Sequence, residues 1–410
     1  MAQRAPAIPF ILVTVLIDMM GVGLLLPVIP TLVREFAPSV KDQTYWYGGM
    51  VFTFGFTQFL CAPLLGALSD RYGRRLVLLL SIAGLGTQFF LSAVVTSLPM
   101  LLATRVIGGL FASNISVGNA YVADITKPED RARSFGLVGA AFGVGFILGP
   151  VIGGMLGSLS IRLPFYVASG LSFCNFLYGA FVLPESLPPE RRRPIDLRKA
   201  NPFGALVGLV RLKGVGALVT VIALANLAQF VLNATWVIHN EYKFGWGPRE
   251  NGLSLFTVGL MFALVQGVLL GRLLRLLGER KVVLLGLASA VFAYLGYGLA
   301  TQGWMLFAIS IANVLAFAVS AAINALVSKA ADKTEQGLAM GSLSSLNSLV
   351  AVVAPVIGTP LFAHVSQYPK TDIRIGAPFF LGAILSALSF GVAVWHFSRT
   401  PSFEERVVRS

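Results

Sequence analysis

Twelve long apolar segments determine what this chain can fold into, because each has about the length that crosses a membrane. A helix of about 20 apolar residues spans the ~30 Å hydrocarbon core of a bilayer. Backbone in lipid must satisfy its own hydrogen bonds, and segments of this length are too long for barrel strands. We therefore predict twelve transmembrane helices, over residues 8–33, 47–68, 76–96, 98–123, 132–157, 163–183, 214–238, 251–271, 281–301, 304–329, 337–363 and 376–398.

The composition excludes a soluble protein. Hydrophobic residues make up 56% of the chain and charged residues 12%, with a mean hydropathy of +0.79, whereas soluble domains carry about 25% charged residues. The net charge of +13 does not indicate nucleic-acid binding, because that function needs a basic face on a folded domain, and here the charges lie in short loops. The first apolar segment is too long for a signal peptide, so we expect it to be retained.

The distribution of Lys and Arg predicts the orientation of the helices. If the N-terminus is cytoplasmic, the inner loops and tails hold 23 of these residues, the outer loops hold 7, and Arg105 lies within a span. Positive residues accumulate on the cytoplasmic side, so we expect both termini to be cytoplasmic. The one long connection, 184–213, is rich in proline and arginine, and we expect it to be a cytoplasmic linker.

A basic turn occurs once in each half of the chain. Gly66–Arg75 reads GALSDRYGRR, and Gly271–Arg280, 205 residues later, reads GRLLRLLGER, so Gly73 pairs with Gly278. The repeat continues, because GPVIGG at Gly149–Gly154 is matched at the same offset by APVIGT. We therefore expect two fused bundles of six helices, at 1–183 and 214–410, joined by the linker 184–213. Halves with six helices each keep the same orientation and are related by an axis along the membrane normal.

Several segments together resemble one transporter family. GALSDRYGRR is similar to the signature loop between helices 2 and 3 of the major facilitator superfamily. LIDMMGVGLLLPVIPTLV, AYVADITKPEDRARSFG and GAAFGVGFILGPVIGG resemble the tetracycline/proton antiporters of its drug/proton antiporter group, and the likeness covers nearly the whole chain. It implies an all-α inner-membrane protein whose central site, between two pseudo-symmetric bundles, opens alternately to either side. We expect a monomer in the bilayer with a small-molecule substrate and protons as partners, and no cofactor.

Two charged residues lie inside predicted helices. Asp18 is about eleven residues, or roughly 16 Å, into the first helix, near the middle of the membrane. A carboxylate there is costly when charged, so Asp18 is a candidate proton carrier; the alternative is a structural hydrogen bond between helices. Arg105 is roughly 10 Å deep in the fourth helix and could pair with Asp18 to couple proton and substrate; the alternative is an arginine that extends to the outer headgroups. The resemblance assigns Arg105 to the functional arginine of the family's fourth helix.

The basic turn contains one residue that topology does not explain. Asp70 contributes nothing to a positive-inside orientation, and it could pair with an arginine or face a helix N-terminus. In the resembled family this loop latches the cytoplasmic side shut, and Arg275 replaces the acid in the second copy, so we expect a one-sided latch. A solvated loop face is the alternative for several of its members. The expected latch residues are Gly66, Asp70, Arg71, Gly73, Arg74, Arg75, Asp124, Arg131 and Arg133.

Glycines recur along the fifth predicted helix at spacings that allow close helix packing. By resemblance, this series is similar to the antiporter motif of exporters, which favours efflux over uptake. The motif residues are Gly139, Gly143, Gly149, Pro150 and Gly153.

Amide side chains in the predicted helices indicate a polar cavity. Three of them in the seventh helix follow a spacing of three and four, which places them on one face. Lining a central cavity and hydrogen bonding between helices are both open for each amide, and two aromatic residues could supply apolar walls. The candidate substrate-binding residues are Gln58, Gln88, Asn114, Asn119, Asn226, Gln229, Asn233, Trp236, Phe262, Gln266 and Asn313.

Three positions depart from the resembled family. Aligned by eye, its helix 3 aspartate falls at Gln88, its helix 8 histidine at Phe262 and its helix 9 aspartate at Ala290. A cavity without these groups is poorly suited to a divalent cation or a second proton. We therefore expect a neutral or weakly cationic amphipathic substrate in place of magnesium-tetracycline.

Other functional classes have weaker support in the sequence. The three histidines, His239, His364 and His396, are scattered, and neither a metal-binding HExxH, a GxSxG nor a phosphate loop occurs. We expect no metal site, no enzymatic activity and no ATP-driven pump in this chain. The expected function is secondary active, proton-coupled efflux of amphipathic drug-like compounds. Proton-coupled metabolite uptake, sugar transport and a receptor or scaffold remain the alternatives.

Overall fold

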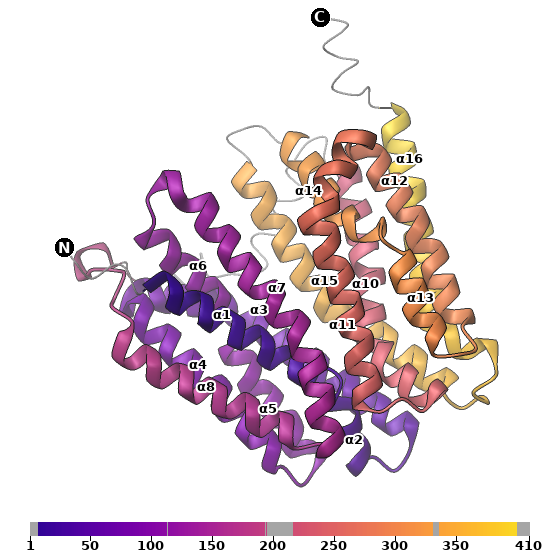
Figure 1. The fold of residues 1–410 in the computed structure, drawn as a ribbon, viewed down its shortest axis with the longest axis horizontal. Coiled ribbons are helices and arrows are strands. Elements are labelled where there is room, and N and C mark those ends of the chain that lie inside the picture. The colour runs from indigo at the N-terminus through magenta and orange to yellow at the C-terminus, as the bar shows by residue number, and fades with distance from the viewer. Residues whose placement is uncertain (1–6, 113, 193, 195–215, 331–335, 400–410) are drawn as a thin grey trace, which may run out of the picture. The chain divides into compact units, whose positions relative to one another are not determined.

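The computed structural model of the chain describes residues 7–112, 114–192, 194, 216–330 and 336–399, and in this part the protein is helical without a strand (Figure 1). Most of the predicted linker 184–213 lies outside the described residues. The chain divides into two compact units: Met1–Pro202 with Asn240–Gly259, and Phe203–His239 with Leu260–Ser410. The bundle boundaries expected from the sequence remain a prediction.

The first unit contains the helices of the N-terminal half. They are α1 (Ala7–Leu25), α2 (Ile29–Phe36), α3 (Val40–Tyr72), α4 (Arg74–Val94), α5 (Leu98–Phe111), α6 (Asn114–Ile125), α7 (Arg131–Leu159) and α8 (Leu163–Val182), with short 3-10 turns η1 (Pro128–Asp130) and η2 (Pro189–Arg191). The main helix pairs are α1 with α7, α4 with α8, and α3 with α5.

The second unit contains most of the C-terminal half. Its helices are α10 (Gly216–Phe244) up to His239, the end of α11 (Pro248–Leu264), the π-helical turn η3 (Val265–Leu269), α12 (Leu270–Leu299), α13 (Trp304–Ala312), η4 (Ala316–Ala318), α14 (Val319–Ala330), α15 (Gln336–Val365), η5 (Ile373–Gly376) and α16 (Ala377–Arg399). Its main pair is α12 with α16.

The expected all-helical membrane fold is confirmed. The described residues contain 10 helices that are long and apolar enough to span a membrane, or 11 when the bent pair α13 and α14 is included. The 52-residue segment Pro248–Leu299 counts as one of these, although Gly278 interrupts its helical conformation. Because this segment holds two of the predicted spans, the helices are consistent with twelve.

Three predicted spans are described as two helices each. The first bends between α1 and α2, where Pro27 lies in the turn and Pro30 is the second residue of α2. Each proline lacks a backbone N–H donor and disfavours the helical conformation of the residue before it. The fourth consists of α5 and α6, and the tenth of α13 and α14, which meet at an angle of 54°.

Glycines allow α1 and α7 to touch through their backbones. A Cβ on Gly149 would lie 2.7 Å from the Cα of Gly23, and one on Gly153 would overlap the carbonyl group of Leu24. In contrast, Gly139 and Gly143 face open space. The glycine series therefore packs α7 against α1 only in its second half.

The sequence repeat has a matching backbone conformation. Gly73, between α3 and α4, has φ 103° and ψ 149°, and its partner Gly278, inside α12, has φ 73° and ψ 159°. Every other residue type would be strained at these φ values. The glycine pairing predicted from the sequence thus marks the same sharp turn in both halves.

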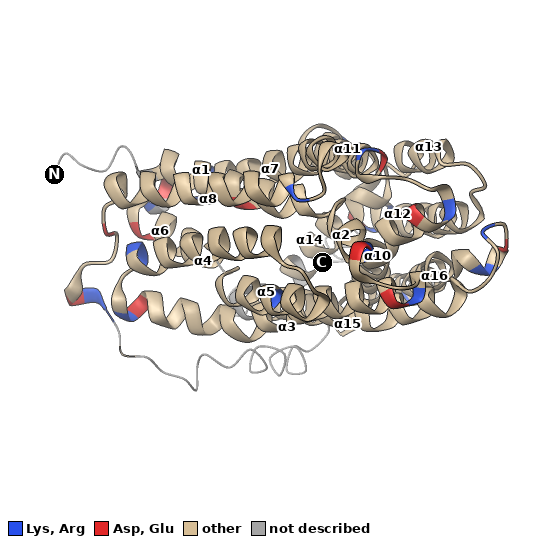
Figure 2. Cartoon of the chain, turned by 90° about the horizontal axis from the view of Figure 1, so that it is seen from below, with Lys and Arg blue, Asp and Glu red and all other residues tan. Residues whose placement is uncertain are grey.

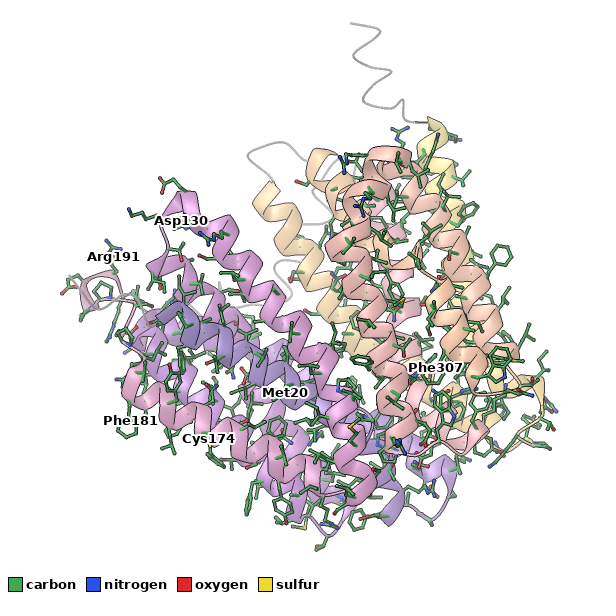
Figure 3. The ribbon with its side chains drawn as sticks, in the orientation of Figure 1. Met20, Asp130, Cys174, Phe181, Arg191 and Phe307 are labelled. Carbon is green, nitrogen blue, oxygen red and sulfur yellow. The ribbon has the colours of Figure 1, made fainter. Side chains whose placement is uncertain are left out.

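The outer faces of the helices are apolar. Phe181 on α8 is 86% exposed and points away from its unit (Figure 3), and α8 carries no charged residue along its length (Figure 2). Contiguous exposed apolar surface of this kind marks contact with a membrane or partner. The chain is a multi-span membrane protein, and this surface suits lipid.

We predict that Gly278→Ala lowers the thermal stability of the purified protein. No atom lies within 4 Å of the position of an added Cβ, so the substitution tests backbone strain alone, at a cost of about 1 kcal/mol. Thermal unfolding in detergent is the measurement. Gly271→Ala is the matched control, because Gly271 has equally open surroundings in the same helix. Equal melting temperatures for the two variants would contradict this account of Gly278.

Candidate functional site

Asp18 is buried in the first unit and held by one amide. It lies on α1 with 4% of its surface exposed, and Asn114 Nδ2 donates a hydrogen bond of 2.9 Å to its Oδ2. Asn114 is the first residue of α6, two residues after Ala112 ends α5 with φ −72° and ψ 4°. Within the described chain, Asp18 Oδ1 and Asn114 Oδ1 are buried without a hydrogen-bond partner. A buried carboxyl with one neutral partner suits proton exchange, because nearby charge does not hold it ionised.

Arg105 belongs to a separate buried network. It lies on α5, is 5% exposed, and donates from Nη2 to Ser92 Oγ on α4 at 2.8 Å. Gln88 Nε2 also donates to this hydroxyl, at 2.8 Å, and Ser92 donates to Thr104 on α5. No ion pair between Arg105 and Asp18 occurs among the described side chains. The two predicted coupling residues therefore have different partners in this structure.

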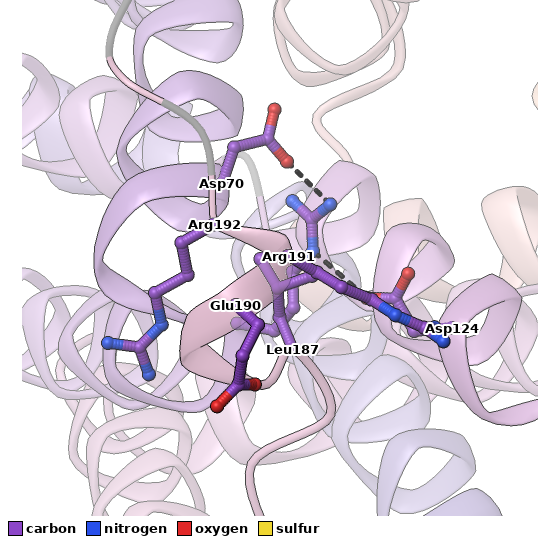
Figure 4. A pocket seen from close by; sticks show the side chains of 7 residues that line it. Asp70, Asp124, Leu187, Glu190, Arg191 and Arg192 are labelled. Carbon is purple, nitrogen blue, oxygen red and sulfur yellow. Dashed lines mark hydrogen bonds and ion pairs between the residues drawn. The ribbon is translucent and has the colours of Figure 1, made fainter.

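Arg74 is the centre of the charged cluster at the α3–α4 turn. Its guanidinium forms ion pairs with Asp70 on α3 and Asp124 on α6 and donates to Ser69. The Arg74 side chain is 12% exposed, so these contacts are partly shielded from solvent. Figure 4 shows Asp70 and Asp124 on either side of this guanidinium. One arginine thus joins the ends of α3, α4 and α6.

Glu185, which follows α8, completes the cluster and was missed by sequence reasoning. Its carboxylate accepts the backbone N–H groups of Arg74, at 2.9 Å, and Arg75, at 3.3 Å. These are free donors of the first turn of α4, where a negative charge is stabilising. A Cβ on Gly73 would overlap this carboxylate. The signal that could have revealed Glu185 is the one that singled out Asp70: an acid in a region where topology favours bases.

A cavity adjoins the cluster. It is lined by Asp70, Arg74, Asp124, Leu187, Glu190, Arg191 and Arg192 (Figure 4).

Not all predicted latch residues join this cluster. Arg75 turns away and donates to the carbonyl of Ala180 at 2.6 Å. Arg71 lies over the ring of its neighbour Tyr72, and Arg131 donates to the carbonyl of Ala123. Gly66 faces open space, and Arg133 is exposed.

Two glutamines contact equivalent helix interruptions in their own units. Gln58 on α3 donates to the carbonyl of Ala112, at the end of α5, at 3.1 Å. Gln266 in η3 donates to the carbonyl of Phe317, in the 3-10 turn η4 that directly precedes α14, at 2.9 Å. A carbonyl released from a helix in an apolar environment needs such a donor. Both side chains thus donate hydrogen bonds to backbone carbonyls. The sequence predicted them as substrate ligands and did not anticipate this interaction.

The polar face of α10 forms hydrogen bonds within the second unit. Asn226 donates to Asn347 on α15 at 2.5 Å, Gln229 donates to Asn233 at 3.0 Å, and Tyr294 donates to Gln229 at 3.4 Å. Interhelical bonding therefore accounts for part of this face, and Gln229 and Asn233 remain exposed.

The remaining candidates differ in accessibility. Trp236 is 3% exposed and packs edge-on against Tyr297, whereas Phe262 is 48% exposed. Asn313 accepts a hydrogen bond from Ser289 at 2.9 Å. Asn119 on α6 is half-buried.

A further buried charge was not anticipated. Glu241, 7% exposed, lies in the segment of the first unit that begins at Asn240. It pairs with Arg34 on α2 at 2.7 Å and accepts from Gln43 on α3 at 2.9 Å. Gln43 also donates to the carbonyl of Pro30, beside the bend between α1 and α2. Only folding brings these groups together, since about 200 residues separate them in the sequence.

Titratable side chains do not gather into a metal site. Among the described residues, no group of three or more His, Cys, Asp and Glu is placed to hold a metal ion.

Comparison with known families and proteins gives one consistent result. The family profile of the Major Facilitator Superfamily matches residues 11–355 and, in a second match, 218–409. The class C tetracycline resistance protein of Escherichia coli is 40% identical, over 87% of this chain and 90% of that protein. The class D protein of Salmonella ordonez is 35% identical, over 89% and 91%.

Solved structures agree with the sequence matches. The crystal structure of the human organic anion transporter MFSD10 superposes with a TM-score of 0.67 and 26% identity, covering 96% of this chain and all of that one. A D-xylose-proton symporter has a TM-score of 0.73 at 17% identity, covering 96% of this chain and 97% of that one, and its likeness concerns the fold alone.

We predict that Glu185→Gln destabilises the protein by about 1 kcal/mol, because the N-terminus of α4 loses a charged acceptor. Thermal unfolding at low salt is the measurement, since salt screens such interactions. Glu190→Gln is the control, because it removes the same charge from an exposed turn nearby. The interpretation fails if both variants melt at the same temperature.

Proposed function

Because the chain belongs to the major facilitator superfamily, we propose that this secondary active transporter exports amphipathic drug-like compounds in exchange for protons. The observation that carries the proposal is the buried Asp18, whose one hydrogen bond comes from a neutral amide. An ionisable group inside a membrane span is expensive to maintain and marks a transport or proton pathway. The named bacterial relatives are resistance proteins, which favours the export direction.

Asp18 is the proposed proton-binding group. In the apolar interior the neutral acid is cheaper than the carboxylate, so proton loss has to be compensated by substrate or by rearrangement of the protein. Arg105 is the proposed second coupling residue. Its partner here is Ser92, so pairing with Asp18 would belong to another conformation, and the change of partner would link proton loss to movement of α5.

The cluster around Arg74 is the proposed latch on the cytoplasmic side. Ion pairs to Asp70 and Asp124 join α3, α4 and α6, and Glu185 ties the chain after α8 to the start of α4. In the second copy Arg275 occupies the position of the acid and donates to Gly271 within its own helix. The latch therefore belongs to one half of the repeat.

The substrate class follows from the polar and aromatic candidates. With Gln88, Phe262 and Ala290 at positions where the resembled antiporters carry ionisable groups, a neutral or weakly cationic amphipath fits better than a metal complex. The names of the relatives nevertheless make tetracycline the first compound to test. The transporter would act as a monomer in the inner membrane. Both termini would lie in the cytoplasm, because the distribution of Lys and Arg favours this orientation.

We predict that the wild type raises the concentration of some amphipathic antibiotics that efflux-deficient cells tolerate, whereas Asp18→Asn gives no more tolerance than an empty vector. The amide keeps the shape of Asp18 but cannot exchange a proton. The measurement is growth inhibition across a compound panel that includes tetracycline, with membrane expression verified.

Asp42→Asn is the matched control, because this carboxylate lies at the N-terminus of α3, where Ser39 bonds it, away from the proposed pathway. It should retain full tolerance. Equal tolerance from the wild type and Asp18→Asn would remove Asp18 from the mechanism. High tetracycline tolerance would overturn the substrate argument while leaving proton coupling intact.

A further inference from the structure

The two unpaired oxygens of the Asp18–Asn114 pair complement each other chemically. One hydrogen bond, from Asn114 Nδ2 to Asp18 Oδ2, is formed, and the other oxygen of each side chain is buried without a partner in the described chain. A carboxylate is only an acceptor, whereas a carboxylic acid also has one donor. A protonated Asp18 can therefore donate from Oδ1 to Asn114 Oδ1, closing a ring with two hydrogen bonds.

We propose that Asn114 is a positioning residue whose hydrogen bonding to Asp18 changes with the protonation state of that acid. The inference rests on the proposed role of Asp18 in proton exchange. When Oδ1 binds a proton, both buried oxygens gain a partner and α1 is joined to the start of α6 by two bonds. When the proton leaves, one bond is lost and a carboxylate oxygen faces an amide oxygen, which is repulsive.

The position of Asn114 in the fold lets this change reach the backbone. Asn114 is the first residue of α6, and Gln58 donates to the carbonyl of Ala112, the residue at which α5 ends. The first turn of a helix is easier to move than its middle, because fewer backbone bonds have to change. Proton loss would thus loosen the first turn of α6 from α1.

Other charges are not placed to take over this role. The helices packed mainly against α1 are α6, α7 and α8, and α4 reaches it where Phe89 lies beside Gly21. The charged residues of these four helices in the described part are Arg74, Arg75, Asp124, Arg131 and Arg133. Asp124 lies ten residues after Asn114, roughly 15 Å along the helix, and pairs with Arg74. The other titratable groups on these helices are Tyr121, Tyr166, Tyr178 and Cys174; Tyr121 donates to the Pro184 carbonyl. On α5, Arg105 is engaged by Ser92.

Infrared difference spectroscopy between acidic and alkaline pH tests the inference without a substrate. Subtracting the difference spectrum of Asp18→Asn from that of the wild type should leave the C=O stretch of one buried carboxylic acid, because the other carboxyl groups, Glu241 among them, contribute equally to both spectra. Asn114→Leu removes both hydrogen bonds of the ring, so the acid band should move to higher wavenumber. In the exchange variant Asp18→Asn/Asn114→Asp the acid and amide change places, and a band close to the wild-type wavenumber should return.

Thr14→Val is the matched control. Thr14 lies one turn before Asp18 on α1 and donates to Asn175, at 3.3 Å, so this variant also loses a buried hydrogen bond of the same helix. It should leave the acid band unmoved. Size-exclusion chromatography shows whether each variant is folded.

The outcomes separate the two proposals. Identical carboxylic acid bands in the wild type and Asp18→Asn would overturn the proton-binding role of Asp18 itself. A band that disappears in Asp18→Asn but does not move in Asn114→Leu would leave that role intact and reject the reading of protonation by Asn114. The exchange variant gives an independent answer if Asn114→Leu does not fold, because an absent band there also rejects the inference.

Discussion

A polar group buried among apolar helices must find a partner, and this constraint accounts for most of the specific contacts in the protein. Loss of hydration costs several kcal/mol for an unpaired amide or carbonyl and more for a charge. Arg105 donates a hydrogen bond to Ser92, and Glu241 accepts hydrogen bonds from Arg34 and Gln43. Gln58 and Gln266 satisfy carbonyls at interrupted helices. Asp18 and Asn114 each keep one buried oxygen without a partner in the described chain, as does the Nε of Arg105, and a buried group left unsatisfied in this way calls for an explanation such as a functional role.

The duplicated halves have similar turns and helix ends but different charged residues. Gly73 and Gly278 make the same sharp turn, and a glutamine in each unit contacts an interrupted helix. The charged cluster at Arg74 and the buried pair at Asp18 belong to the first unit. Because a repeat begins with two equal copies, this difference supports the proposal that proton binding and latching belong to the first half.

Much of the fold could be predicted from the sequence, because the length and apolarity of a segment decide whether it spans a membrane. The bend at Pro27 and Pro30 and the turns at Gly73 and Gly278 could also be anticipated from their residue types. The end of α5 at Ala112 could not, because no proline marks it. The partners of Glu185 and Glu241 lie about 110 and 200 residues away, so local patterns could mark Glu185 as an unusual acid in a basic region but could not identify the groups that either glutamate binds. Asp18 was identified because a single acid in an apolar segment is a strong signal, whereas its amide partner was one of many.

In the proposed mechanism, proton binding and release at Asp18 drive the movement of substrate across the membrane. This can be measured as uptake of a radiolabelled compound into proteoliposomes with an acidic interior. Uptake is compared with and without the pH gradient, a comparison that does not depend on the orientation of the protein. The compound is tetracycline or the one to which the wild type confers the highest tolerance. The gradient should drive accumulation by the wild type, whereas Asp18→Asn should only equilibrate the compound and retain exchange of labelled for unlabelled substrate. Accumulation by Asp18→Asn equal to that of the wild type, or wild-type uptake indifferent to the gradient, would rule out proton coupling through Asp18.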